Sequence, residues 1–178
     1  MNEIITYREM CDREGMNALQ RGMNFRLRSG FSVMLMSRRH NAPYPDRVEE
    51  DGRVIIYEGH DAPRTPLNPE PKKADQPELN PSGSLTQNGL FYRAAVQCRV
   101  GETEPELVRV YEKIMDGVWA YNGVFRLVDA WREERHGRHV FKFRLELTNE
   151  PSMSNQAMTI EHTRVIPSAI KAEVWRRD

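Results

Sequence analysis

The residues whose types and spacing are best suited to chemistry lie between positions 44 and 61. Asp46 and Asp61 flank Tyr57, and two carboxyl groups placed around an aromatic ring can act as a general acid and a general base. One hypothesis from this pattern is a small hydrolase that uses Asp46 and His60. The sequence supplies neither an activated nucleophile nor a cluster of metal ligands beside them, so this hypothesis has little support.

The common signatures of nucleotide-binding and hydrolytic sites are absent from the sequence. No GxGxxG, P-loop, GxSxG or HExxH pattern occurs. The five histidines are scattered, and His136 and His139 fall at a predicted hairpin end, which favours exposed turn residues. Cys11 and Cys98 lack CxxC spacing, which favours reduced thiols over a disulfide framework or a structural zinc site. We therefore expect no catalytic site, cofactor or metal in this chain.

Arginines concentrate in one part of the chain, although the formal net charge of the whole chain is zero. A zero net charge argues against a protein that coats nucleic acid by electrostatics alone. Between positions 21 and 47 there is a single acid, Asp46, against Arg21, Arg26, Arg28, Arg38, Arg39 and Arg47. Taken alone, such a cluster is typical of a solvated surface.

The length and composition indicate one globular domain. A chain of 178 residues is long enough to bury a core of its own. No apolar run approaches the length of a membrane span, and charged residues between Glu3 and Arg13 exclude an N-terminal signal segment. Together with the two lone cysteines, these features predict a cytoplasmic protein.

Two helices and one long loop are predicted. Thr6 to Arg21 has helical spacing, with Thr6 as the N-cap and Glu9 three residues later. A second helix is expected from Thr86 to Val100. His60 to Gly83 is rich in proline, asparagine and charged residues, which predicts a long loop.

The remaining apolar segments predict strands. They are Ser32–Met36, Arg53–Tyr57, Leu107–Tyr111, Val118–Tyr121, Val124–Trp131 and Val140–Leu147. Turns are expected at Asn122-Gly123 and His136-Gly137. The result is an α+β fold, with a curved β-sheet or barrel and flanking helices.

Several short motifs follow one another in a specific order across the middle of the chain. They are Gly30-Phe-Ser-Val-Met-Leu-Met36, Tyr44, Asp46, Ile56-Tyr-Glu-Gly59, Asp75-Gln76, Leu85-Thr-Gln-Asn88, Val108-Arg-Val-Tyr111, Tyr121 to Trp131, and Val140-Phe-Lys-Phe-Arg-Leu145. In order and spacing they resemble the SRA (SET and RING associated, or YDG) domain over roughly residues 28 to 147. The sequence departs from the family's namesake motif at Asn122, where the family has aspartate; both residues can support a turn.

The resemblance implies a DNA-binding domain of PUA-like fold that flips a 5-methyl- or 5-hydroxymethylcytosine out of the duplex into a fitted pocket. It places Tyr57 and Tyr44 as the two aromatic faces that stack on the base. It places Asp46 as the acceptor for the exocyclic N4 amine. Ser37 and Glu58 are expected in the same pocket.

The resemblance also implies DNA contacts on both sides of the first long strand. The expected residues are Arg26, Arg28 and Ser29 before the strand, and Arg38, Arg39, His40 and Asn41 after it. Arginine suits contacts to phosphates and base edges, and it can fill the gap that a flipped base leaves. The expected partner is double-stranded DNA containing modified cytosine. A homodimer is left open, and no membrane is expected.

The C-terminal segment carries a second resemblance. Thr163 to Asp178 is similar to the helix that leads into an HNH nuclease domain in bacterial SRA–HNH modification-dependent restriction endonucleases. We therefore expect residues 1–148 to form the DNA-binding domain and 149–178 to form a linker and lead-in helix. A divalent metal is expected only in a nuclease domain outside this chain. The alternatives are a plain C-terminal helix, a PUA-like module for RNA or single strands, and the hydrolase.

Overall fold

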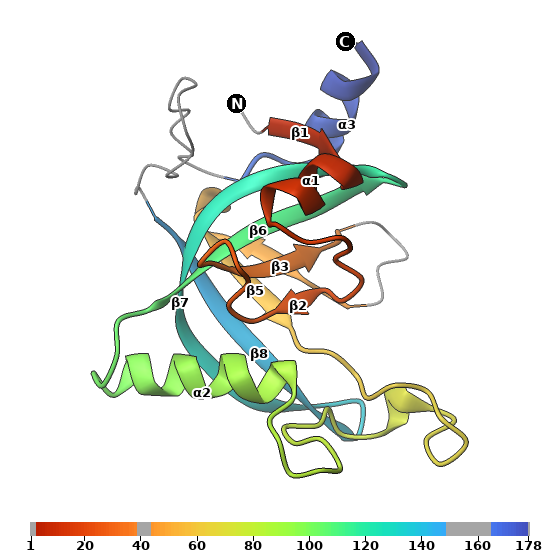
Figure 1. Cartoon of the computed structure of the whole chain (residues 1–178), viewed down its shortest axis with the longest axis vertical. Coiled ribbons are helices and arrows are strands. Elements are labelled where there is room, and N and C mark those ends of the chain that lie inside the picture. Colours follow the sequence, from red (N-terminus) through yellow and green to blue (C-terminus); the bar gives the residue numbers. More distant parts are fainter. Residues whose placement is uncertain (1–2, 39–43, 149–164, 178) are drawn as a thin grey trace.

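Figure 1 shows a computed structural model of the chain, which describes residues 3–38, 44–148 and 165–177. Its centre is an open, curved sheet of eight strands in the order β2-β3-β6-β7-β8-β5-β4, with β1 paired to β7 outside this path. The strands are β1 Glu3–Thr6, β2 Met23–Asn24, β3 Ser32–Met36, β4 Arg47–Glu49, β5 Val54–Glu58, β6 Glu106–Met115, β7 Val118–Arg135 and β8 Arg138–Leu147. β3 and β6 are parallel, and the other paired strands are antiparallel. The predicted α+β class with a curved sheet is confirmed.

The first helix, α1 (Tyr7–Arg13), begins where the sequence predicts and ends earlier. The Thr6 side chain accepts a hydrogen bond from the Glu9 N–H at 3.2 Å, and the Glu9 carboxylate accepts one from the Thr6 N–H at 2.7 Å. This capping box satisfies two N–H groups that have no partner inside the helix. The prediction of a helix as far as Arg21 is wrong, because Gly15 adopts a left-handed φ of 65° directly after the C-cap.

The second helix, α2 (Gln87–Arg99), closes the main core against the sheet, as Figure 1 shows. Thr86 caps it by accepting from the Gly89 N–H at 3.2 Å. Phe91 and Ala95 are fully buried, and the rings of Phe91 and Phe143 on β8 form a T-shaped contact with centroids 6.1 Å apart. The predicted helix from Thr86 is therefore confirmed. None of the described helices is long and apolar enough to cross a membrane.

The long strand β7 continues through Asn122-Gly123, so the turn predicted there is wrong. Val110 of β6 faces Gly123, and the next residue, Tyr111, faces Tyr121, which leaves Asn122 as one extra residue in β7. This is a β-bulge, and the φ of 106° at Gly123 is one that only glycine adopts easily. The chain instead reverses between β6 and β7 at Gly117, whose φ is 79°.

The loop after β5 is largely irregular, as predicted, but it is fixed to the sheet. It contains one short 3-10 helix, Pro71–Lys73, and a two-residue turn closed by Thr65 and Asn68. The Gln76 side chain is buried, donates to the Gly59 carbonyl at 2.6 Å and accepts from the Phe141 N–H at 2.8 Å. These bonds hold the later part of the loop, at Gln76, beside the end of β5 and against β8.

The third helix, α3 (Ser168–Arg177), lies against the sheet near β6 (Figure 1). Its Lys171 is 2% exposed and donates hydrogen bonds to Glu112 at 2.6 Å and to the Asn122 side-chain oxygen at 2.7 Å. Just before the helix, the Val165 N–H donates to the Gly52 carbonyl at 2.7 Å. The described part of the predicted lead-in segment is therefore docked on the sheet.

Candidate functional site

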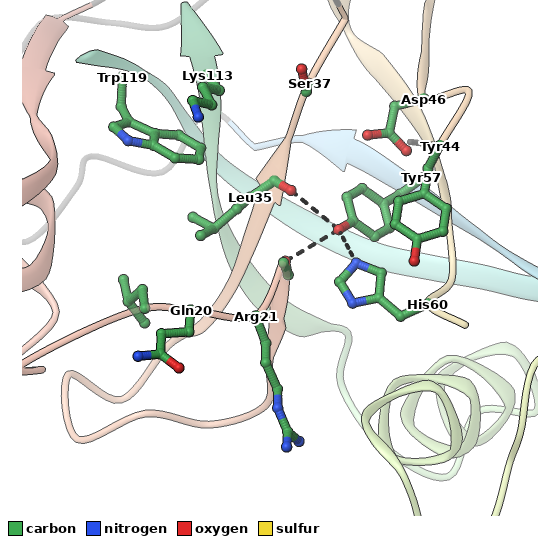
Figure 2. Close-up of a pocket in the computed structure, with 12 residues that line it drawn as sticks. Gln20, Arg21, Leu35, Ser37, Tyr44, Asp46, Tyr57, His60, Lys113 and Trp119 are labelled. Atoms are coloured by element: carbon green, nitrogen blue, oxygen red, sulfur yellow. Dashed lines mark hydrogen bonds between the residues drawn. The ribbon is translucent and has the colours of Figure 1, made fainter. Parts of the chain in front are cut away.

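A cavity of about 470 Å³ opens beside the ends of β3 and β5 (Figure 2). This volume is in the range of sites that hold small organic ligands. Segments that are far apart in the sequence line it: residues 19–22, Leu35 and Ser37 at the end of β3, Tyr44 and Asp46 before β4, Tyr57 and His60 at the end of β5, and Lys113 with Trp119 on β6 and β7. Charged, polar and aromatic side chains thus converge on one cavity.

Tyr57 forms the inner end of the cavity and belongs to the main core. Its ring is 1% exposed, and its hydroxyl lies 3.2 Å from the carbonyl oxygens of Gly22 and Leu35. The same hydroxyl lies 2.9 Å from Nε2 of His60. A side chain at position 22 would collide here, because a Cβ on Gly22 would lie 2.7 Å from the Tyr57 hydroxyl and 2.6 Å from Cε1 of His60. Glycine, which has no Cβ, therefore leaves the room at position 22 that the Tyr57 hydroxyl and the His60 ring occupy.

His60 stacks flat on Tyr44, with ring centroids 5.0 Å apart and an interplanar angle of 11°. Its backbone is clamped by Asn88 of α2, which accepts from the His60 N–H at 2.9 Å and donates to the His60 carbonyl at 2.8 Å. Burial lowers the pKa of His60 to about 4, since the charged imidazolium loses its hydration. The imidazole is therefore neutral at pH 7.

Asp46 lies near the backbone end of Tyr57, whereas His60 contacts the hydroxyl end (Figure 2). The carboxyl group of Asp46 accepts a hydrogen bond from the Glu58 N–H at 3.1 Å, and the Ser37 backbone also donates to it. Burial raises the pKa of Asp46 to about 7, and these two backbone bonds only partly oppose the shift. The group is thus poised to gain or lose a proton near neutral pH.

Comparisons with known proteins identify the fold. No protein-family model and no curated protein matches the sequence. Solved structures do match: the SUVH5 SRA domain in complex with hemimethylated CG DNA has a TM-score of 0.56 and 22% identity, with 84% of this chain and 89% of that chain covered. This chain has the SRA fold.

Two further complexes contain a domain with a similar fold. The SUVH5 SRA domain bound to fully hydroxymethylated CG DNA has a TM-score of 0.55 and 21% identity, with 84% of this chain and 89% of that chain covered. KRYPTONITE in complex with mCHG DNA and SAH has a TM-score of 0.51 and 17% identity, and the match covers 88% of this chain and 34% of that chain. None of these three structures contains information on the predicted association of this domain with an HNH nuclease domain.

Within this SRA fold, four of the five residues expected in the pocket do line the cavity: Ser37, Tyr44, Asp46 and Tyr57. Glu58 lies outside it, because its carboxylate forms ion pairs with Lys142 at 2.7 Å and Arg135 at 2.8 Å. Only the backbone N–H of Glu58 serves the site, through its bond to Asp46. Tyr57 presents its hydroxyl end rather than an open ring face. Tyr44 is less buried than Tyr57, so it offers the more accessible ring, although His60 stacks on one of its faces.

The residues expected to contact DNA fall at both ends of β3. Arg26 and Arg28 are exposed on the turn that precedes the strand, and Arg26 pairs with Glu106 at 3.0 Å. The Ser29 hydroxyl faces inward and donates to the buried Glu14 at 2.8 Å. Arg38 is exposed after the strand, at the end that carries the cavity. Arg39, His40 and Asn41 lie outside the described residues.

The geometry gives no support to the hydrolase hypothesis. Asp46 and His60 share the cavity, but no hydrogen bond joins them, and the neighbour of His60 Nε2 is the Tyr57 hydroxyl. The Asp61 carboxylate is held by Arg138 at 2.6 Å. Among the described residues, no group of three or more His, Cys, Asp and Glu side chains is arranged to hold a metal ion.

Sequence reasoning missed part of the lining: Gln20, Gly22, Leu35, Lys113 and Trp119. These residues enter through strand pairing and through a turn, which leave no local signal in the sequence. The motif residues Gln76 and Asn88 did carry a signal. They hold the backbone of Gly59 and His60 and so position the cavity from outside.

Proposed function

We propose that this chain is a DNA-binding domain that recognises a C5-modified cytosine, which it binds after the base has flipped out of the duplex. The observation that carries this proposal is a single cavity, in an SRA fold, that combines the aromatic ring of Tyr44 with the buried carboxyl group of Asp46. A flipped pyrimidine needs both, a face to stack on and a partner for its Watson–Crick edge.

The chemistry of the cavity suits cytosine. Its N4 amine is a donor, and the Asp46 oxygens are acceptors in either protonation state. Stacking of a base on an aromatic ring is worth roughly 1–3 kcal/mol, so Tyr44 supplies binding energy that does not depend on the base edge. The complexes of the SUVH5 SRA domain hold fully methylated and fully hydroxymethylated CG DNA, which agrees with this choice of ligand.

The surface around the cavity suits the rest of the duplex. Arg21 lines the cavity and is exposed, and Arg38 is exposed at the same end of β3. Exposed arginines at this position can bind the phosphates beside a flipped nucleotide. The proposal needs one copy of the chain, and the SRA neighbours give no support to a homodimer.

In its finer form, the proposal assigns this domain to the targeting half of a modification-dependent HNH endonuclease. The support is the resemblance of residues 163–178 to an HNH lead-in helix. On this proposal residues 1–178 bind DNA without cutting it, because no set of metal ligands to activate water was found among the described residues. Cleavage of DNA by the purified chain with added Mg²⁺ or Mn²⁺ would contradict it.

The decisive experiment is a binding assay with matched duplexes that carry C, 5-methylcytosine or 5-hydroxymethylcytosine at one central position. We expect tighter binding to the modified duplexes, and brightening of a fluorescent base analogue at that position as it leaves the stack. Equal binding to all three duplexes would refute the proposal. Tighter binding to single strands or RNA would favour the PUA-like alternative.

A further inference from the structure

We propose that Arg21 binds a phosphate of the flipped nucleotide itself, so that it favours flipped over stacked DNA although it touches no base. The inference rests on the proposed function and deepens it, because it assigns the anionic part of the ligand to one side chain of the cavity. It is carried by the position of Arg21 relative to Asp46, by the free guanidinium group of Arg21 and by the charge of the cavity lining.

The position of Asp46 sets the direction of the sugar. Asp46 accepts from the Glu58 N–H near the backbone end of Tyr57, whereas His60 contacts the Tyr57 hydroxyl at the other end of that side chain. In cytosine, the ring atom directly across from C4, which carries the N4 amine, is N1, which carries the sugar. A base that turns N4 toward Asp46 therefore turns its sugar away from Asp46, toward the end of the cavity where His60 lies.

Arg21 lies at this same end of the cavity. The next residue, Gly22, is so close to the two side chains there that a Cβ on it would lie 2.7 Å from the Tyr57 hydroxyl and 2.6 Å from Cε1 of His60. Figure 2 shows the Arg21 side chain near His60, with its guanidinium group directed away from Asp46. Burial is the main cause of the low pKa of His60, and the nearby positive charge of Arg21 lowers that pKa further. The sugar–phosphate backbone of a bound nucleotide and the guanidinium group of Arg21 therefore meet at one end of the cavity.

The backbone of Arg21 is fixed, whereas its side chain is available to a ligand. The Arg21 carbonyl accepts a hydrogen bond from the side-chain amide of Asn24 at 2.8 Å. Within the part of the chain that the structure describes, the Arg21 guanidinium group forms no ion pair, in contrast to Arg26, which pairs with Glu106 at 3.0 Å. An exposed guanidinium group presents five N–H donors in a planar fork, which suits the oxygens of a phosphate.

The charge of the lining favours an anionic ligand, although the whole chain has a formal net charge of zero. Arg21 and Lys113 are its cationic side chains, and Lys113 is already paired with Asp116 at 2.7 Å. Asp46 is the one acidic side chain among the described residues of the lining, and because burial raises its pKa to about 7, it is ionised about half of the time at pH 7. A cytosine base is uncharged, so it leaves the charge of Arg21 unbalanced. A backbone phosphate supplies the missing negative charge.

The contact depends on flipping because Arg21 belongs to the cavity that receives the base. A nucleotide that enters the cavity brings its own phosphates to this side chain, whereas a stacked nucleotide remains outside. Phosphate contacts usually carry no sequence information. This contact adds to the selectivity for modified cytosine, because the guanidinium group gains this partner only when the base is bound.

The test removes one phosphate charge at a time from a duplex that contains a single 5-methylcytosine. A neutral methylphosphonate replaces the phosphate on the 5′ side of that nucleotide, the phosphate on its 3′ side, or a phosphate near the end of the duplex. For the full wild-type chain, we expect one of the two flanking replacements to weaken binding about fivefold, as measured by fluorescence anisotropy. Arg21→Met lacks the cation, so the same replacement should change its affinity by less than about twofold.

Arg8→Met is the matched control variant. Arg8 is exposed on α1, pairs with Asp12 of the same helix and does not line the cavity, so this variant should keep the wild-type loss of about fivefold. A purely structural role of Arg21 would not make the effect of a change in the DNA depend on this side chain.

The inference is overturned if neither flanking methylphosphonate weakens binding by the wild-type chain, or if both weaken the wild-type chain and Arg21→Met equally. In either case, a preference of the wild-type chain for modified over unmodified duplex would leave the proposed function intact. Loss of that preference would refute the proposed function itself.

Discussion

The protonation state of Asp46 should control binding to modified DNA across neutral pH. Burial raises the pKa of this carboxyl group to about 7; the nearby Glu58 raises it further, and Lys142 partly opposes the shift. A protonated carboxyl group offers one donor and one acceptor, which match N3 and N4 of cytosine. An ionised group can only accept, so it pairs with N4 and repels the lone pair on N3.

The size of the effect follows from the pKa. The protonated fraction falls from about nine-tenths at pH 6 to about one-tenth at pH 8, and the apparent dissociation constant varies inversely with the binding-competent fraction. We therefore expect up to about tenfold weaker binding at pH 8 than at pH 6, or roughly 1.4 kcal/mol. His60, with a pKa of about 4, stays neutral throughout this range and does not contribute.

Asp46→Asn is the matched control. An amide presents the same donor and acceptor pair as a protonated carboxyl group but does not titrate, so this variant should bind modified DNA with little dependence on pH. Asp46→Ala should bind about 5- to 150-fold more weakly, since it leaves the base edge without a partner. The assay is fluorescence anisotropy with a modified and an unmodified duplex from pH 6 to pH 8. The reasoning is refuted if wild-type affinity is flat over this range, or if Asp46→Asn keeps the wild-type pH dependence.

Three other expectations concern the same fold. Tyr44→Ala should weaken binding to modified DNA about 5- to 150-fold and change binding to unmodified duplex little, as measured by anisotropy; preserved discrimination would place the base elsewhere. Affinity should fall linearly with salt on logarithmic axes, and Arg28→Ala should lower that slope by about one and weaken all duplexes alike, whereas a salt-independent affinity would contradict a phosphate contact. Lys171→Met should destabilise the fold by about 3–5 kcal/mol in a denaturant titration, because it removes the ammonium group that donates to buried Glu112, and adding Glu112→Gln should recover part of the loss.

The parts of the fold that the sequence predicts well are those with local causes. The capping box of Thr6 and Glu9 marks the start of α1, and the apolar runs at Ser32–Met36 and Val140–Leu147 form β3 and the greater part of β8. Each depends on side chains within one turn or one strand. Asn122-Gly123 has equally good local chemistry for a turn, yet it forms a bulge because β7 continues to pair with β6 on both sides.

The cavity was harder to predict because its walls come from pairings between distant segments. Met23 pairs with Met34, which brings Gly22 beside Leu35 and the Tyr57 hydroxyl. On the other side of β3, Lys113 of β6 pairs with Trp119 of β7, and both side chains line the cavity. Motif comparison located Tyr44, Asp46 and Tyr57, but burial and proton affinity depend on these tertiary contacts.

The departure from the SRA namesake motif at Asn122 has a physical cause in the structure. Asn122 is fully buried in the bulge, where its oxygen accepts from Lys171 at 2.7 Å and its amide donates to Glu112 at 3.3 Å. Lys171 and Glu112 already balance one positive and one negative charge in the interior. An ionised aspartate at this position would add a second negative charge and could not donate to Glu112. Asparagine can therefore bind both Lys171 of α3 and Glu112 without adding a charge. Through its bond to Lys171, the bulge of β7 helps to hold the C-terminal helix on the sheet.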